Sequence, residues 1–353
     1  MTIYDIAIVL IPLLALLLKP IGYNAIDNIE YKSTKKYLIL IGLILTLIPG
    51  LRHYSIGLDT FQYEDFFKGL PSSLALAFKQ SRLEPGYTLL NVLFKSFDFV
   101  VVQIVVSSIL IFFSFRMVRR YSPMIWLSCL LFIIYCFYYR CFNEMRQAIA
   151  LGFICLSFDY IIEKKIIKYL ICLFAAAVFH QTSLIFLSTI VLLFVDKIKW
   201  WQIVGLFLCT FGLTIYANFI IQAFLPLFRT DYSGMDEEAG GWGLLLLQVF
   251  TFVLAIFRYR YLKWDRTNII LIFMMGVSVA IFPICHINPM LFRLEDYYFV
   301  FMIILVPRIM ASINIPLFRY AITIGYLVVG YFFYFTNLFS ESNQMLPYRF
   351  FWE

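Results

Sequence analysis

Long apolar stretches recur along the whole chain and constrain its fold more than any other feature. Each spans roughly 13–25 residues, the length over which a helix rising 1.5 Å per residue crosses a hydrocarbon layer about 30 Å thick. Both faces of the stretches are apolar, whereas strands of a transmembrane barrel alternate apolar and polar residues. We therefore expect an all-α, polytopic integral membrane protein. The stretches cover 3–18, 37–49, 99–115, 124–139, 142–162, 169–194, 202–225, 244–257, 269–285, 298–313 and 320–339.

The composition excludes a soluble globular enzyme. Of 353 residues, 63% are hydrophobic and only 14% are charged, and the mean hydropathy is +0.87. Soluble domains are nearer one half apolar and one quarter charged. No composition shift separates a soluble unit, so we treat residues 1–353 as a single membrane domain.

Basic residues gather in the short connections between the apolar stretches. The connections 19–36, 116–123, 163–168 and 258–266 each carry several Lys or Arg residues within a net charge of +7. Positive connections mark the cytoplasmic side of a membrane protein, so we expect all four to be cytoplasmic. Because the positive charge is divided among connections rather than gathered in one patch, we expect no nucleic-acid partner.

The stretch 169–194 decides the topology of everything after it. As one helix it would be about 39 Å long, more than a bilayer core needs without tilt. A single crossing would also place the basic connection 258–266 outside and the acidic loop 226–243 inside. We therefore expect the chain to reverse near His180, with short membrane helices at 169–179 and 184–195. This gives about 12 transmembrane elements, with both termini outside.

The largest connection, 50–98, then lies on the outer side of the membrane. Its composition suggests short amphipathic helices at the interface, around 72–79 and 86–97. The other chemically varied segments share this face in the same scheme.

The first polar cluster follows the second apolar stretch and contains Arg52, Asp59 and Tyr63. An arginine holds phosphate oxygens through its planar two-point fork, and Asp59 with Tyr63 could orient a hydroxyl-rich acceptor. The alternative is an interfacial loop in which Arg52 extends to the membrane surface and Tyr63 belongs to the aromatic belt.

A second cluster, Glu84-Pro85-Gly86-Tyr87, comes directly before an expected helix. Pro85 and Gly86 fix a turn, which would present the Glu84 carboxylate at a defined place near the membrane surface. The alternative is a carboxylate that only caps the helix.

A third cluster opens the apolar stretch 142–162. At 100° per residue, Arg140, Asn143, Glu144 and Gln147 share one helix face, and Arg146 lies close to it. Because a charged face is costly against lipid, we expect it to line a polar cavity. The alternative is an Arg140–Glu144 pair, four residues apart, at the membrane surface.

Two further candidates are His180 at the proposed reversal and Arg293 ahead of a late apolar stretch. A neutral imidazole could be a base or a pyrophosphate ligand, and Arg293 could be a second phosphate clamp. A histidine that satisfies turn backbone and an arginine that anchors the interface are the alternatives. No nucleotide-binding, serine-hydrolase or metal-ligand spacing occurs, so we expect no cofactor and no metal site.

Together these clusters resemble the EpsG family of exopolysaccharide polymerases, which are related to the Wzy O-antigen polymerases. The order and spacing match across roughly residues 45–195 and more weakly after them. The resembling pieces are Arg52 with Gly57-Leu58-Asp59-Thr60 and Tyr63; Glu84-Pro85-Gly86-Tyr87; Asn143 with Met145-Arg146-Gln147-Ala148-Ile149-Ala150; Phe179-His180-Gln181-Thr182-Ser183; and Arg293 with Tyr297-Tyr298 and Pro347-Tyr348.

The resemblance implies a glycosyltransferase of the bacterial cytoplasmic (inner) membrane, with its active site facing the periplasm or exterior. Its substrate would be an undecaprenyl-pyrophosphate-linked oligosaccharide, transferred onto another lipid-linked repeat unit. Membrane lipids, a flippase and a chain-length regulator are the further partners implied. The rival functions are a lipid-linked glycan flippase, a polytopic O-acyltransferase and a single-sugar glycosyltransferase.

The resemblance and the residue chemistry together suggest roles for ten side chains. Arginines would stabilise the pyrophosphate leaving group, one acidic or imidazole group would be the base, and polar side chains would orient sugars. We expect Arg52, Arg146 and Arg293 to bind pyrophosphate, Asp59, Glu84 or His180 to be the base, and Asn143, Gln147, Tyr63 and Tyr87 to orient sugars. Arg52, Glu84, Arg146 and His180 should then line one cavity.

Overall fold

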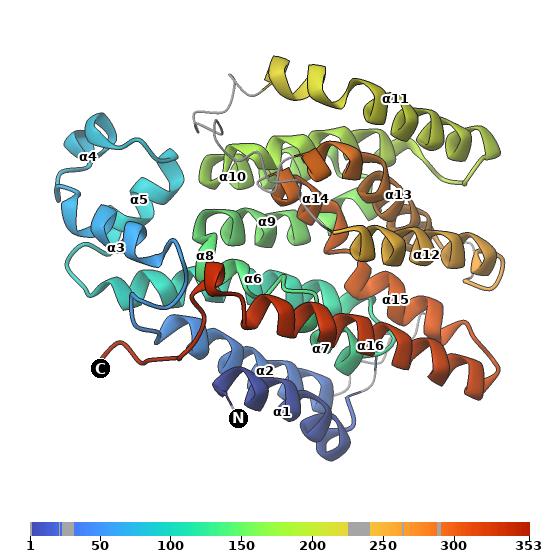
Figure 1. Ribbon diagram of the computed structural model, residues 1–353, viewed down its shortest axis with the longest axis horizontal. Coiled ribbons are helices and arrows are strands. Elements are labelled where there is room, and N and C mark those ends of the chain that lie inside the picture. Colours follow the sequence, from blue (N-terminus) through green and yellow to red (C-terminus); the bar gives the residue numbers. More distant parts are fainter. Residues whose placement is uncertain (1, 21, 23–31, 225–240, 263–264, 288–290) are drawn as a thin grey trace.

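The described part of the chain is all-helical. A computed structural model describes residues 2–20, 22, 32–224, 241–262, 265–287 and 291–353 (Figure 1). Within these ranges the only β pairing is an isolated bridge between Arg52 and Phe350. The acidic loop at 226–240 and Lys263 lie outside the described residues.

Five described helices are long and apolar enough to cross a membrane: α2 (Lys32–Gly50), α6 (Phe99–Tyr121), α9 (Met145–Ile162), α13 (Arg266–Ile287) and α16 (Pro316–Leu338). Shorter apolar segments accompany them: α1 (Ile3–Leu18), α7 (Ile125–Ile134), α10 (Ile166–Phe179), η1 (Gln181–Phe194), the part Trp200–Tyr216 of α11 (Trp200–Phe224) and α12 (Trp242–Arg258). The remaining helices are α3 (Thr60–Gly69), α4 (Leu74–Gln80), α5 (Pro85–Leu93), α8 (Arg140–Asn143), α14 (Phe292–Phe299), α15 (Met302–Ala311) and η4 (Glu341–Asn343). The predicted class, a helical multi-pass membrane protein, is confirmed; the number of about 12 transmembrane elements stays a prediction.

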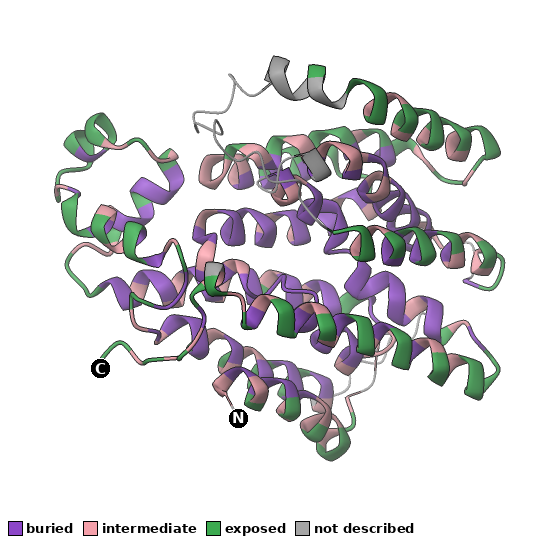
Figure 2. Ribbon diagram, in the orientation of Figure 1, coloured by how far each residue is buried: buried purple, intermediate pink, exposed green. Residues whose placement is uncertain are grey.

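Burial is concentrated in the middle of the helix bundle. Buried residues fill α9, α7 and α15, whereas α11 and α16 present exposed faces (Figure 2). The apolar window of α9 is 72% buried and that of α16 only 28%. Large apolar side chains such as Phe207 and Leu317 are exposed on the outer helices. Such continuous apolar surface fits contact with lipid rather than with water.

The chain reverses at His180 as predicted. Helix α10 ends at Phe179, His180 is extended, and η1 begins at Gln181. The Tyr169 hydroxyl donates to the Phe186 carbonyl at 2.7 Å, so the two segments run side by side in opposite directions. Lys164 and Asp196 at their far ends form an ion pair of 2.7 Å. The polar run after Phe179 thus ends the helix and returns the chain to the side from which it came.

The basic connections meet at one end of the bundle. Arg120 at the end of α6 pairs with Asp159 near the end of α9 at 2.7 Å. Arg266 at the start of α13 donates to the Val195 carbonyl at 2.6 Å. Arg308 on α15 donates to the Tyr121 carbonyl at 2.8 Å. The expectation that 116–123, 163–168 and 258–266 share one side is therefore confirmed by their contacts. Most of 19–36 lies outside the described residues. The cytoplasmic position of all four connections stays a prediction.

The opposite end carries the connection 50–98 and both termini (Figure 1). Three short helices, α3, α4 and α5, form there; two lie near the expected positions, and α3 was not expected. The C-terminal tail pairs with the segment after α2, because Gly57 donates to the Gln344 carbonyl and His53 to the Arg349 carbonyl, both at 2.9 Å. The C-terminal tail is therefore hydrogen-bonded to the beginning of the connection 50–98.

Candidate functional site

Gly57 joins the segment after α2 to the start of α9. Its φ is +92°, a left-handed conformation that glycine adopts without penalty. A Cβ there would lie 2.8 Å from both the Asn143 Oδ1 and the Phe142 carbonyl oxygen. Asn143 Oδ1 in turn accepts from the Leu58 backbone N–H at 2.8 Å. This close approach places Asp59 beside the N-terminus of α9.

Gly86 likewise allows a close approach, here between α5 and α10. A Cβ at Gly86 would lie 2.8 Å from the Val178 side chain and 2.9 Å from its carbonyl oxygen. Pro85 opens α5 at its first position, where its missing N–H costs nothing, and Glu84 is the N-cap residue. The tight contact therefore brings Glu84 to the end of α10, next to His180.

Glu84, Arg146 and His180 form the centre of the cluster. One carboxylate oxygen of Glu84 accepts a hydrogen bond from Arg146 Nη1. The other lies 3.2 Å from His180 Nδ1 and 3.5 Å from the Gln181 backbone nitrogen. Arg146 Nε also lies 3.4 Å from the Tyr63 hydroxyl. Residues separated by as many as 97 positions thus meet at one end of the bundle.

A second set of charges adjoins this centre and is organised by Glu144. Its two carboxylate oxygens bind Arg293 Nε at 2.9 Å and Arg140 Nη1 at 2.8 Å. Arg140 Nε is also 2.8 Å from Asp296 Oδ2. Gln147 Nε2 donates to Asp296 at 2.9 Å and to the Arg293 carbonyl at 3.1 Å. The start of α14 is therefore held against the start of α9.

The electrostatic balance differs among the candidate bases. Burial by itself would raise the pKa of Glu84, but the hydrogen bond from His180 and the Arg146 charge outweigh it and lower the pKa to about 2. Burial lowers the pKa of His180, with Glu84 opposing that effect. Burial raises the pKa of Asp59, opposed by Arg293. At neutral pH these directions give an ionised Glu84 and a neutral His180.

The cationic groups are the more exposed members of the cluster. The Arg146 and Arg293 side chains are 20% and 27% exposed, whereas Glu84 and Glu144 are 11% and 10% exposed. The carboxylates therefore lie behind the guanidiniums. The ring nitrogen Nε2 of His180 is buried and has no hydrogen-bond partner among the described residues. This arrangement presents positive charge outward and leaves one buried imidazole nitrogen without a partner among the described residues.

Glu84, Arg146 and His180 converge as expected, whereas Arg52 does not join them. That the three line one cavity stays a prediction. The Arg52 side chain is 1% exposed, and it donates to the Ile56 and Phe142 carbonyls at 3.2 and 3.1 Å. It also reaches Thr60 Oγ1 at 3.2 Å. Since its donors are used inside the protein, Arg52 positions the segment after α2 and does not fit the expected pyrophosphate-binding role.

Three of the expected sugar-orienting residues are also buried. Tyr87 is fully buried, with its hydroxyl 3.8 Å from the Met145 sulfur, and its ring packs edge-on against Tyr63 at 5.3 Å. Gln147 is buried between α9 and α14, and Tyr63 is buried with its hydroxyl 3.4 Å from Arg146 Nε. Asn143 is partly exposed but is engaged by the Leu58 N–H. These side chains hold the cluster in place rather than face a ligand.

The sequence did not assign roles to Asp296 or to the two-sided position of Glu144. The Arg140–Glu144 pair could be predicted, because its members are four residues apart on one helix. The contact between Arg293 and Glu144 could not, because 149 positions separate the two residues in the sequence. Thr182 and Tyr297 also approach each other at 3.4 Å beside the cluster. Among the described residues, no group of three His, Cys, Asp or Glu side chains could hold a metal ion.

Fold and site together define a polytopic helical membrane protein with an arginine, histidine and carboxylate cluster at the end of the bundle opposite its basic connections. A family model for the EpsG family matches residues 35–350, nearly the whole chain. The chain therefore belongs to the EpsG family, the family of Wzy-like exopolysaccharide polymerases. No curated protein and no solved structure matches it.

Proposed function

We propose that this chain is a polysaccharide polymerase of the bacterial cytoplasmic membrane. It transfers a glycan from an undecaprenyl-pyrophosphate carrier onto a sugar hydroxyl of another lipid-linked repeat unit, at the outer face. The observation that carries the proposal is the meeting of Glu84, Arg146 and His180 from three distant segments, in a chain of the EpsG family. The cluster combines a base and anion-binding groups, the two requirements of this transfer.

In this proposal Arg146 and Arg293 bind the lipid pyrophosphate. Both guanidiniums are part of ion pairs that fix their positions, and both keep an exposed portion that a phosphate oxygen could reach. As the bond between the anomeric carbon and the pyrophosphate oxygen breaks, negative charge grows on that oxygen. Guanidiniums already in place stabilise this charge without reorganisation.

The proposed base is His180. Binding of the acceptor displaces the side chains that cover Nε2 in the free protein. The acceptor hydroxyl then gives its proton to Nε2 while its oxygen forms the new bond to the anomeric carbon. Glu84 accepts from Nδ1–H, which fixes the tautomer with Nε2 unprotonated and stabilises the imidazolium that forms. Glu84 itself is a weak base because its pKa is about 2. Asp59 has a raised pKa and lies near Arg293, so it is assigned to orienting the acceptor.

The decisive experiment uses purified protein and lipid-pyrophosphate-linked repeat units, with EDTA present and no nucleotide sugar. Lengthening of the glycan supports the proposal. Arg146→Lys should slow it by about 10²-fold, because lysine keeps the charge but loses the planar fork. His180→Ala should slow it by about 10²–10⁴-fold.

Asn91→Ala is the matched control, since this buried side chain donates to the Tyr87 carbonyl of its own helix. It should cost stability without a comparable loss of rate. A strict requirement for a nucleotide sugar would instead indicate a single-sugar glycosyltransferase. Lipid transport without bond formation would indicate a flippase, and consumption of an acyl donor an acyltransferase.

A further inference from the structure

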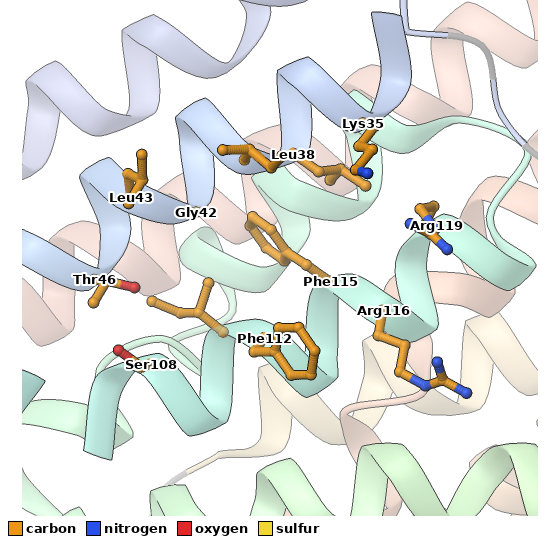
Figure 3. A pocket seen from close by; sticks show the side chains of 12 residues that line it. Lys35, Leu38, Gly42, Leu43, Thr46, Ser108, Phe112, Phe115, Arg116 and Arg119 are labelled. Carbon is orange, nitrogen blue, oxygen red and sulfur yellow. The ribbon is translucent and has the colours of Figure 1, made fainter. Parts of the chain in front are cut away.

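A cavity of about 470 Å³ lies between α2 and α6, away from the charged cluster at the other end. Its walls are apolar side chains such as Leu38, Leu43, Phe112 and Phe115 (Figure 3). Leu43 and Phe112 are exposed at its rim, so the cavity opens on the outer surface of the bundle. Since α2 and α6 both have the length of membrane spans, this surface faces lipid.

Gly42 forms the floor of the cavity. A Cβ at Gly42 would make only ordinary contacts, 3.6 Å from both Ile111 and Phe115. The missing side chain leaves room along the crossing of the two helices, and nothing in the backbone conformation demands glycine here. A single apolar chain lying along the groove would fill this room.

All the charge of the groove is positive and lies at one end. Lys35, Arg116 and Arg119 line that end, and Thr46 and Ser108 line the other (Figure 3). None of the lining residues is acidic. The Arg116 guanidinium is paired with Asp159 on α9 at 2.6 Å and points away from Lys35 (Figure 3). The Lys35 side chain is exposed at the same end of the groove.

The length of the groove matches one leaflet of a bilayer. From Lys35 to Thr46 the α2 helix rises roughly 17 Å, about half of a 30 Å hydrocarbon core. The basic end belongs to the end of the bundle where the basic connections meet, which the positive-inside rule assigns to the cytoplasm. The groove therefore runs from the cytoplasmic headgroup level to the middle of the membrane.

We infer that this groove binds an anionic glycerophospholipid of the cytoplasmic leaflet, such as phosphatidylglycerol. The phosphate lies beside Lys35 and Arg119, Arg116 adds positive charge at the same end of the groove, and one acyl chain passes over Gly42. Basic pockets between membrane helices recognise anionic headgroups through the same charge complementarity. This site is distinct from the cluster at the opposite end, and the inference does not depend on the proposed polymerase activity.

The test measures phospholipid retained by the purified full-length protein. Detergent-solubilised protein is given equal amounts of dioleoyl phosphatidylglycerol and dioleoyl phosphatidylcholine, and bound lipid is counted by native mass spectrometry. The wild type should retain more of the anionic lipid. Lys35→Gln should lower its retention about fivefold, which corresponds to about 1 kcal/mol for one basic residue at a lipid surface, and leave the neutral lipid unchanged.

Lys36→Gln is the matched control, because Lys36 is the exposed neighbour of Lys35 and does not line the groove. Gly42→Leu should lower retention of both lipids by filling the path of the acyl chain. If Gly42→Leu does not fold, the comparison of Lys35→Gln with Lys36→Gln still tests whether the groove binds the anionic headgroup. Equal retention by Lys35→Gln and Lys36→Gln contradicts the inference, and so does displacement of phosphatidylglycerol by an equal concentration of a polyprenyl phosphate.

Discussion

At the scale of single residues, the candidate site separates groups that can react from groups that hold them. Two arginines are partly exposed, Arg146 and Arg293, and the Nε2 atom of His180 has no hydrogen-bond partner among the described residues. By contrast, Arg52 and Tyr87 are buried and their polar atoms contact other protein groups. The distinction matters for mutagenesis, because loss of a buried donor leaves its former acceptors without partners and costs stability. Activity lost in such variants is not evidence of a chemical role.

The pairing of His180 with Glu84 predicts the pH dependence of polymerisation. Because the pKa of His180 is lowered by burial, the base stays neutral and active as pH falls through 6.5. The rate should therefore decline only below that value, as pH falls through the lowered pKa. Glu84→Gln removes the group that raises the His180 pKa, so the acidic limb should move to still lower pH while the maximal rate drops.

The measurement is the rate of glycan lengthening against pH for purified wild type and Glu84→Gln. An acidic limb that stays in place in Glu84→Gln would argue against the coupling. A limb that survives in His180→Gln would assign the titration to another group, with Asp59 the first to examine because burial raises its pKa.

Gly57 gives a second prediction at this scale. Ala at this position must adopt a left-handed conformation, which costs roughly 1–2 kcal/mol, and its Cβ must displace Asn143 or Phe142. Gly57→Ala should lower the free energy of unfolding by at least that amount and reduce activity. Gly69→Ala is the control, since nothing lies within 4 Å of its Cβ. Thermal unfolding in detergent compares them, and equal midpoints would contradict the role given to Gly57.

At the scale of helices, the reversal at His180 could be predicted and other breaks could not. The reversal follows from the excess length of the stretch 169–194, its polar run and the distribution of basic connections. The stretch 124–139 gave no such signal, yet α7 ends at Ile134 and Cys136 has a φ of +62°. The backbone N–H groups of this turn donate to nearby carbonyls, as Cys136 does to Ile133 and Tyr139 to Cys136. The turn itself is buried by other helices, and an apolar local sequence does not display such a buried turn.

The same limit explains the error over Arg52. A sequence shows that an arginine follows a membrane helix, and both a ligand-binding and a surface position are compatible with that. Its burial depends on acceptors at Phe142 and Thr60, the first of which is 90 positions away. The order of motifs predicted which segments converge, but only the packing shows which side chains face outward.

The contact of α5 with α10 predicts that a substitution at Gly86 moves Glu84, although Gly86 itself takes no part in the charged cluster. Gly86→Ala should push α5 away from Val178 and separate Glu84 from His180. The rate of glycan lengthening should then fall more than stability does. Gly325→Ala, whose Cβ would meet nothing within 4 Å, should leave both unchanged. A Gly86→Ala variant with full activity would show that this contact does not position Glu84.

At the end of the bundle where the basic connections meet, the contacts of Arg266 predict that its substitution lowers stability. Its guanidinium donates to the carbonyls of Ile161 and Ile162 at the end of α9 and to those of Leu192, Leu193 and Val195 at the end of η1. Arg266→Ala should lower the free energy of unfolding by about 2 kcal/mol or more, because several buried carbonyls lose a charged donor. Arg260→Ala, an exposed neighbour, is the control. Similar unfolding midpoints for the two variants would contradict this capping role.

At the scale of the whole molecule, the two ends of the bundle differ in chemistry. One gathers the basic connections around the ends of α6, α9 and η1, and the other gathers the charged cluster, the short helices and both termini. By the positive-inside rule this polarity predicts an orientation in which the basic connections lie in the cytoplasm. The proposed function requires that orientation, because it uses lipid-linked glycans at the outer face, where nucleotide sugars are absent.

The orientation can be tested by cysteine labelling from outside intact cells. The background replaces all seven cysteines, of which six are buried and only Cys209 is exposed. Ser72 lies exposed between α3 and α4 at the end of the charged cluster, and Lys197 lies exposed beside Asp196 at the basic end. Ser72→Cys should react with an impermeant maleimide in intact cells, and Lys197→Cys only after permeabilisation. The reverse pattern would put the cluster in the cytoplasm, where an outer-face polymerase cannot work, and would overturn the proposed function together with the cytoplasmic position of the lipid groove.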